Sequence, residues 1–382
     1  MNTKPSLWLM VVMLMFPQIV ETIYSPALGA IAKSFSVSNS QAAQTISIYF
    51  FAFAIGVVTW GILADKLGRR PTMIIGLFIY ASAAVVAMKT ESFAIILIAR
   101  AVSAFGIAVG SIVTQTMLRD AFGGKELSKV FSLMGIGISI SPVLGMLLGG
   151  KLSATGGHHD VFFALAAMAV ILLTYNLAKL PETQKEKQSL QLFSLSLCII
   201  KDKNVMLSAL LVALYNVALF SYYQLGAFIF VDLGFNSSLF GYSGVVLGIG
   251  TLLGSYLNKT LLTRKASFHT LLWVSVSLLT IGALGVYLIL DSIWFLTPMM
   301  LVVISFSIAI PNILSAALVN YKQQTGSAGA IFGLLYYLMI GAGLTLAGVV
   351  QHLGIVLVTC SAMALVATMS WVDSRASNST VR

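Results

Sequence analysis

The chain has 382 residues, of which 58% are hydrophobic and only 9% are charged, against roughly 25% charged residues in an ordinary soluble domain. This composition excludes a water-soluble globular protein, because a soluble fold of this length could not hide so much apolar surface. The formal net charge of +10 does not indicate nucleic acid, because the basic residues lie between apolar stretches. We expect membrane lipids as partners and no nucleic acid.

Apolar stretches of about twenty residues recur along the chain, the length that a helix needs to cross a bilayer. They are continuous, whereas the strands of a membrane barrel alternate over about ten residues. The first contains Pro17 and Glu21 and lacks a convincing cleavage site, so we interpret it as a retained membrane helix rather than a signal peptide. Hydropathy predicts twelve spans, near residues 6–28, 42–64, 72–88, 93–117, 128–150, 161–179, 204–227, 239–258, 268–290, 292–317, 328–351 and 353–372.

The polar stretch from Pro181 to Asn204 divides these spans into two sets of six. We therefore predict an all-α integral membrane protein, with a six-helix bundle over residues 1–180, a cytoplasmic linker over 181–203, and a second bundle with a short tail over 204–382. Two such halves are typical of transporters built from repeats. Residues 190–200 are apolar enough for a short amphipathic helix on the membrane surface, and a plain linker is the alternative.

Basic residues are distributed very unevenly between the two sides of the predicted spans. With the N-terminus inside, the cytoplasmic segments hold eighteen basic residues, and the outer loops hold only Lys33, Lys89 and Lys151. By the positive-inside rule this predicts a multi-pass protein of the cytoplasmic membrane with both termini in the cytoplasm.

The loop between the second and third predicted helices, residues 61–71, reads GILADKLGRRP. A carboxylate here stands at a helix end before a tight glycine turn, with cations one to five residues away. Such a cluster can tie helix ends together in one state and release them in another. The alternative is that the cations only set orientation, which leaves the acid and the glycines unexplained. The conformational residues predicted in this loop are Gly61, Asp65, Gly68, Arg69 and Arg70.

Arg100 lies several residues inside the fourth apolar span. A buried arginine in a membrane costs a few kcal/mol or more unless it is paired or hydrated, so it is a candidate functional residue. Helical spacing places Ser103, Ile107 and Ser111 on the same face. The alternative is an arginine that snorkels to the outer interface.

Glu21 lies midway through the first apolar span, with Gln18 and Ser25 on its face and Tyr24 beside it. A carboxyl group in such surroundings can carry a proton at near-neutral pH. We therefore predict that Glu21 couples transport to protons, together with Arg100. The alternative is that Glu21 pairs permanently with Arg100 as a structural contact.

The fifth predicted helix is rich in small residues around a proline. Such residues let helices approach closely, and the proline allows a bend. The residues that we single out are Gly137, Ser141, Pro142 and Gly145.

Residues 61–71 resemble the hallmark loop of the major facilitator superfamily, and the fifth helix is similar to the antiporter motif of its export branch. The sequences around Tyr24–Pro26 and Arg119–Asp120 resemble the bicyclomycin/chloramphenicol-resistance (Bcr/CflA) group of drug:proton antiporters. This resemblance implies the major facilitator fold and adds Arg119 and Asp120 to the conformational residues. In the fifth helix, Ser141 replaces the glycine of the antiporter motif. A further departure concerns the first helix, because the group usually has its acid where this chain has Thr22, one position after Glu21.

Aromatic and amide side chains in the spans would suit a partly hydrophobic substrate with a few hydrogen-bonding groups. Core packing explains any one of them equally well. The cavity candidates are Gln18, Tyr24, Ser111, Gln115, Asn216, Phe220, Tyr223, Asn312, Phe332 and Tyr336.

We therefore predict a proton-coupled antiporter that exports small amphipathic molecules, either drugs or a secreted metabolite such as a siderophore, by alternating access. It is expected to be a monomer that exchanges protons for a small-molecule substrate and to need no cofactor. No metal is expected, because the adjacent His158, His159 and Asp160 lack the spacing of a tetrahedral site. The alternative is a proton-coupled uptake symporter of the same fold, and a remote alternative is an intramembrane enzyme or receptor.

Overall fold

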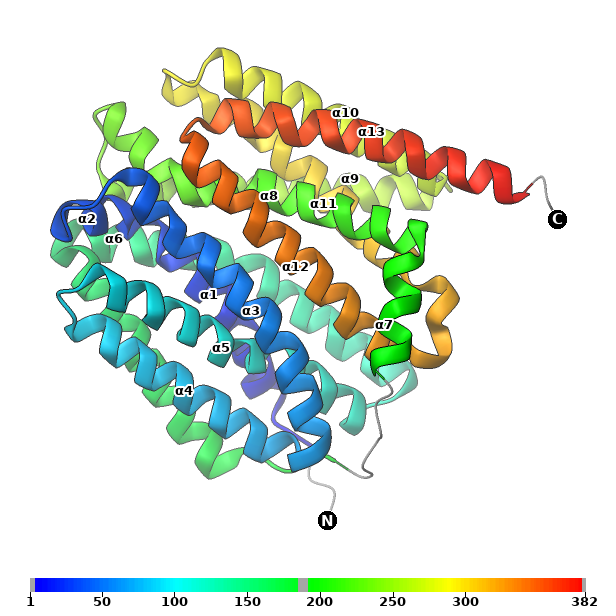
Figure 1. Ribbon diagram of the computed structural model, residues 1–382, viewed down its shortest axis with the longest axis horizontal. Helices are drawn as coiled ribbons and strands as arrows, with labels where there is room; N and C mark the ends of the chain where they lie inside the picture. The colour runs from blue at the N-terminus through cyan, green and yellow to red at the C-terminus, as the bar shows by residue number, and fades with distance from the viewer. Residues whose placement is uncertain (1–3, 185–191, 380–382) are drawn as a thin grey trace. The chain divides into compact units, whose positions relative to one another are not determined.

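The computed structural model describes residues 4–184 and 192–379, so that residues 185–191 of the predicted linker and the extreme ends of the chain lie outside the described residues. The described residues form helices joined by short turns and contain no strand (Figure 1). In chain order the elements are α1 (Leu7–Ile23), η1 (Ser25–Ala27), α2 (Leu28–Ser34), α3 (Asn39–Leu67), α4 (Arg69–Lys89), α5 (Phe93–Ala121), α6 (Gly124–Lys179), α7 (Leu192–Lys201), α8 (Lys203–Asp232), α9 (Ser237–Thr263), α10 (Phe268–Leu288), η2 (Ile293–Phe295), α11 (Leu296–Ala317), η3 (Val319–Gln324), α12 (Thr325–Val350) and α13 (Leu353–Ser379).

Eleven helical segments among the described residues are long and apolar enough to cross a membrane. One of them, α6, has 56 residues, about 84 Å at 1.5 Å per residue, which is far more than a single crossing of ~30 Å needs. Its backbone leaves the helical region at Gly157, where φ is 65° and ψ is −146°. The element is therefore two helices joined at a glycine.

Both halves of α6 pack against the same helix, α1. In the first half, a Cβ added at Gly137 would lie 3.0 Å from Val11 Cγ1. In the second half, Asn176 Nδ2 contacts Met13 Sδ at 3.3 Å. Because residues about forty positions apart in α6 meet the same turn of α1, the two halves form an antiparallel hairpin. Counted in this way, the described residues supply the twelve predicted crossings.

The structure corrects two predicted boundaries. The sequence predicted a continuous first helix over residues 6–28, but α1 ends at Ile23 and a short 3-10 turn separates it from α2. Pro26 is the cause, since it has no N–H for the helical ladder, and its carbonyl accepts a hydrogen bond from Ser153 Oγ at 3.0 Å. The predicted outer loop over 151–160 is helical except at Gly157, because one glycine suffices to reverse the chain.

The chain forms two compact units, residues 1–190 with 236–244 and residues 191–235 with 245–382. In the first unit α1 packs against α6, and α3 and α4 pack against α5. In the second unit α8 contacts α11, α12 and α13, while α10 contacts α11 and α13. Residues 192–201, toward the end of the predicted linker, form the helix α7, which contacts α8 and α12.

A substitution at Gly157 tests the hinge in α6. Gly157→Ala should lower the free energy of unfolding by about 1–3 kcal/mol, because an L side chain rarely adopts this backbone conformation. Crowding is not the cause, since the nearest atom to an added Cβ is Ala30 Cβ at 3.8 Å. The measurement is the Tm of the purified protein in detergent. Gly135→Ala is the matched control, because nothing lies within 4 Å of its added Cβ, and equal Tm values for both variants would contradict the hinge.

Candidate functional site

The side chain of Arg100, on α5, lies inside the first unit and is only 3% exposed. Its guanidinium carbon lies 4.0 Å from the centroid of the Tyr24 ring and 4.7 Å from that of the Tyr49 ring. Aromatic faces attract a cation, and more strongly when both are removed from water. Arg100 is therefore held between two tyrosine rings in the bundle, and the alternative of a snorkelling arginine is wrong.

Glu21 faces the same interior from α1 and is 7% exposed. Its carboxylate interacts electrostatically with Arg100 and with Tyr49. It does not form an ion pair within 4.0 Å with any residue that the structure describes. The alternative of a permanent Glu21–Arg100 salt bridge is therefore wrong in this structure. Tyr80 of α4 is buried and also interacts electrostatically with Arg100. We call Glu21, Tyr24, Tyr49, Tyr80 and Arg100 the Arg100 site.

Arg100 keeps unused hydrogen-bonding capacity. The Nε of Arg100 is buried and has no hydrogen-bond partner among the described residues. Buried polar groups in proteins are nearly always paired, so an unpaired one needs an explanation. A ligand, a proton or water entering the bundle would provide the missing partner.

The contacts of Thr22 show which way the neighbouring positions 21 and 22 face. The Thr22 side chain packs against Gly145 of α6, and its hydroxyl donates to the carbonyl of Gln18 at 2.8 Å. One residue turns a helix by about 100°. Position 22 thus faces α6, and position 21 faces Arg100.

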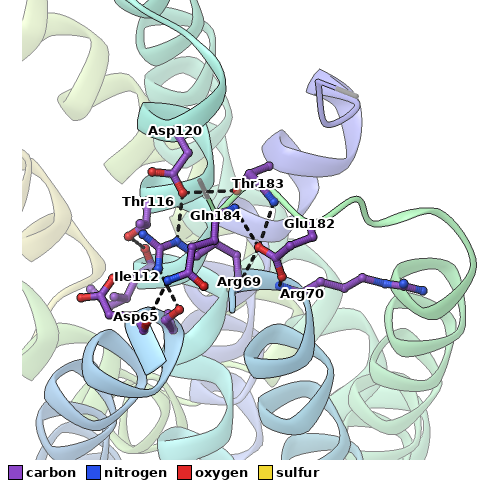
Figure 2. Close-up of polar contacts among 10 residues, drawn as sticks. Asp65, Arg69, Arg70, Ile112, Thr116, Asp120, Glu182, Thr183 and Gln184 are labelled. Carbon is purple, nitrogen blue, oxygen red and sulfur yellow. Dashed lines mark hydrogen bonds and ion pairs between the residues drawn. The ribbon is translucent and has the colours of Figure 1, made fainter. Parts of the chain in front are cut away.

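A second polar group joins the ends of three helices (Figure 2). We call its residues, Asp65, Arg69 and Asp120, the Arg69 cluster. Arg69 Nη1 donates to Asp65 Oδ1 at 2.8 Å, and Arg69 Nε donates to Asp120 Oδ2 at 2.9 Å. The Arg69 side chain is 6% exposed, so water screens these ion pairs little. One guanidinium therefore links the end of α3, the start of α4 and the end of α5, as a planar fork of donors allows.

The segment after α6 completes the Arg69 cluster. Thr183 Oγ1 donates to Asp120 Oδ2 at 3.3 Å, and Gln184 Nε2 donates to the carbonyl of Asp65 at 2.7 Å. The carboxylate of Glu182 accepts hydrogen bonds from four backbone N–H groups. Burial would raise the pKa of Glu182, but these hydrogen bonds outweigh it and hold that pKa below its usual range. The carboxylate therefore stays ionised at neutral pH, and its stabilising effect is lost only as the pH falls through this lowered pKa.

The remaining motif residues lie in different surroundings. Arg70 Nη2 donates to the carbonyl of Leu177 at 2.9 Å. Arg119 is exposed and lies 5.8 Å from the centroid of the Phe131 ring, outside the described contacts of the Arg69 cluster. Gly61 has room for a Cβ, whose nearest neighbour would be 3.9 Å away.

The small residues of α6 allow it to lie close to α1. A Cβ at Gly145 would overlap Thr22, while Pro142 lies inside the helix. Ser141 is buried, and its hydroxyl donates to the carbonyl of Gly137 at 2.7 Å. The predicted role of this stretch in close helix packing therefore matches its contacts.

The other cavity candidates fall in both units. In the first unit Gln18, Ser111 and Gln115 are half-buried on α1 and α5. In the second unit Asn312 Nδ2 donates to Asn258 Oδ1 at 2.7 Å. The rest lie on α8 and α12, and they are Asn216, Phe220, Tyr223, Phe332 and Tyr336.

Sequence reasoning missed Tyr49, Tyr80 and the Glu182–Gln184 segment. The tyrosines stand in apolar spans, where an aromatic residue usually indicates packing. No local signal marks the segment, because an acid shortly after a helix end resembles any solvated carboxylate until the fold brings it to the basic loop.

Comparison with known proteins identifies the family. The pattern of the Major Facilitator Superfamily matches residues 8–344. The chain belongs to the Major Facilitator Superfamily. The predicted fold is thereby confirmed, and the protein is a multi-pass membrane transporter rather than an enzyme.

Relatives within the Major Facilitator Superfamily support the Bcr/CflA resemblance. The chain is 31% identical to an uncharacterized transporter of Rickettsia felis, over 88% of this chain and 87% of that protein. It is 24% identical to a bicyclomycin resistance protein homolog of Haemophilus influenzae, over 87% of each chain. Its fold is similar to that of a bacterial homolog of the human lysosomal transporter Spinster in an inward-facing, unoccupied conformation, with a TM-score of 0.72, 15% identity, and coverage of 96% of this chain and 95% of that one.

The geometry of the Arg69 cluster predicts that lysine cannot replace arginine at position 69 of this superfamily member. Arg69→Lys keeps the charge but removes the fork that reaches both carboxylates, so we expect a loss of about 1–3 kcal/mol in the free energy of unfolding. The Tm of the purified protein measures this loss. Arg119→Lys is the control and should leave the Tm unchanged, whereas equal losses in the two variants would show that the bridge contributes nothing specific.

Proposed function

We propose that this transporter is a proton-coupled exporter of small amphipathic molecules. It works by alternating access in the cytoplasmic membrane, with both termini in the cytoplasm. The observation that carries the proposal is the placement of Glu21 and Arg100 in one bundle interior, near each other but without a salt bridge. An ionisable residue inside a membrane span is a functional candidate by default, since its burial is costly.

The charge of the Arg100 site determines how a proton and a substrate affect each other. When Glu21 is ionised, its charge and that of Arg100 cancel, and protonation of Glu21 leaves a net positive site. A ligand shifts this equilibrium only by its different affinities for the two states. A cationic or hydrogen-bond-donating substrate prefers the ionised state and displaces the proton, which is antiport. An anionic substrate prefers the protonated state, which would produce symport.

The Arg69 cluster supplies the conformational part of the proposal. Its contacts join helix ends through one guanidinium and two carboxylates. Charged groups of this kind form discrete contacts that are either made or broken. We assign the cluster to stabilising one of the two states between which the transporter alternates.

Relatives support the choice of substrate. The Haemophilus influenzae relative is named for bicyclomycin resistance, and aromatic side chains surround Arg100 on two sides. Aromatic surfaces bind the apolar part of a ligand while a few polar groups orient it. We therefore favour amphipathic drugs as substrates, with a secreted metabolite such as a siderophore as the second substrate class.

Removal of the titratable group tests the coupling. Glu21→Gln should abolish ethidium efflux driven by a pH gradient in proteoliposomes, because a neutral amide cannot exchange a proton. Ethidium is a cation, so it should still bind to the purified variant but more weakly, because the neutral amide leaves the positive charge of Arg100 unbalanced. The control is Glu126→Gln, since Glu126 is a 55% exposed carboxylate that, among the described residues, pairs with Lys4 alone. Gradient-driven efflux at the normal rate in the Glu21→Gln variant would remove Glu21 from the mechanism.

Substitution of the cation tests its influence on Glu21. Arg100→Ala should make Glu21 hold its proton to higher pH, because a nearby cation favours the ionised carboxylate. The pH of maximal ethidium efflux should then rise by about one unit or more, measured in proteoliposomes with the gradient held fixed. Arg100→Lys keeps the charge and should shift the pH of maximal efflux less. An unchanged pH dependence in the Arg100→Ala variant would show that the two residues act independently.

A further inference from the structure

The carboxylate of Glu182 occupies the turn between α3 and α4. Its Oε1 accepts from the backbone N–H of Arg69 at 3.0 Å, and its Oε2 accepts from that of Arg70 at 3.0 Å. The N–H groups of Thr183 and Gln184 also donate to Oε1, at 2.9 and 2.8 Å. The first amides of a helix lack partners within the helix and bind an anion well. Glu182 thus fixes the first turn of α4 from a distant part of the chain.

Gly68 leaves room for this carboxylate, and its backbone conformation also favours glycine. Its φ of 104° lies in the region that favours glycine. A Cβ at this position would also lie 2.7 Å from Glu182 Oε2, which is closer than real Cβ atoms come. The glycine therefore provides the space in which the carboxylate reaches the two amides.

The two residues after Glu182 extend the contact to the neighbouring helices. Thr183 reaches Asp120 at the end of α5, and Gln184 reaches the backbone of Asp65 at the end of α3 (Figure 2). We call residues 182–184 the clasp. The clasp follows α6 directly, so a movement of the end of α6 moves the clasp with it.

We propose that Glu182 is a positioning residue of the transporter, which holds the start of α4 so that Arg69 bridges Asp65 and Asp120. This inference rests on the proposed function, in which the Arg69 cluster stabilises one transport state. It extends that function to a residue in the segment after α6, because the clasp connects the hallmark loop to the helix pair that packs on α1.

Two measurements on Glu182→Gln test the proposal, with Glu126→Gln as the matched control. The first is hydrogen exchange of the Arg69 and Arg70 amides in the purified full-length protein. The side-chain amide of the Glu182→Gln variant places an N–H donor against these backbone donors and weakens their hydrogen bonds to position 182. We expect exchange at the two amides to become about tenfold faster, which corresponds to a loss of about 1.4 kcal/mol in the free energy of this interaction. Exchange equal to that of the wild type would overturn the proposal.

The second measurement is ethidium efflux in proteoliposomes under a fixed pH gradient. Positioning predicts that Glu182→Gln lowers the maximal rate about tenfold and leaves the half-saturating concentration within about twofold. A normal maximal rate, or an effect confined to the half-saturating concentration of ethidium, would overturn the positioning role. If the wild type itself moves no ethidium, the proposed function fails for this probe. The exchange measurement still tests whether Glu182 holds the Arg69 and Arg70 amides.

A double-mutant cycle keeps the proposal testable if Glu182→Gln folds poorly. Gly68→Ala should slow efflux less in a Glu182→Ser background than in the wild type, because the short side chain removes the clash and leaves only the backbone strain. Additive effects of the two substitutions would show that Gly68 and Glu182 do not act together, and would overturn the proposal.

Discussion

The cost of placing charge inside an apolar helical bundle determines how this transporter is organised. An isolated ion loses most of its solvation there, so each buried charge needs a partner or a compensating surface. Arg100 receives two tyrosine faces, and Arg69 receives two carboxylates. The first arrangement leaves hydrogen-bonding capacity open, which suits a binding site. The second pairs Nε and Nη1 of the guanidinium with carboxylates, which suits a contact that holds helix ends.

A single helix carries one part of each site. Arg100 and Asp120 both belong to α5, and twenty residues of helix separate them by about 30 Å. The close approach of α6 to α1 at Gly145 places Glu21 on the side of Arg100, and the chain that leaves α6 supplies Glu182. Rigid helices and their close contacts thus connect the Arg100 site with the Arg69 cluster. A change at one site can bias the other when such packed elements have two discrete arrangements.

The spans and the charged residues were predictable from the sequence, because length, hydropathy and an isolated charge in an apolar run are local signals. Glu21 and Arg100 stand out for this reason, and the spacing of the hallmark loop identified Arg69. The role of Glu182 was not predictable, since an acid in a polar segment resembles any solvated carboxylate until the fold brings it to α4. Hydropathy does not report backbone geometry, so it indicates a loop over residues 151–160 where the structure has a break at Gly157 alone.

The central claim is that a proton and the substrate compete for Glu21. The most direct test is proton release when ethidium is added to the purified transporter in weakly buffered detergent solution, followed with a pH indicator. The account predicts that the wild type releases protons in proportion to bound ethidium, and that Glu21→Gln, which binds the cation more weakly, releases none at ethidium concentrations that saturate it. Equal proton release from both proteins, or saturable binding to the wild type with no release, would contradict it.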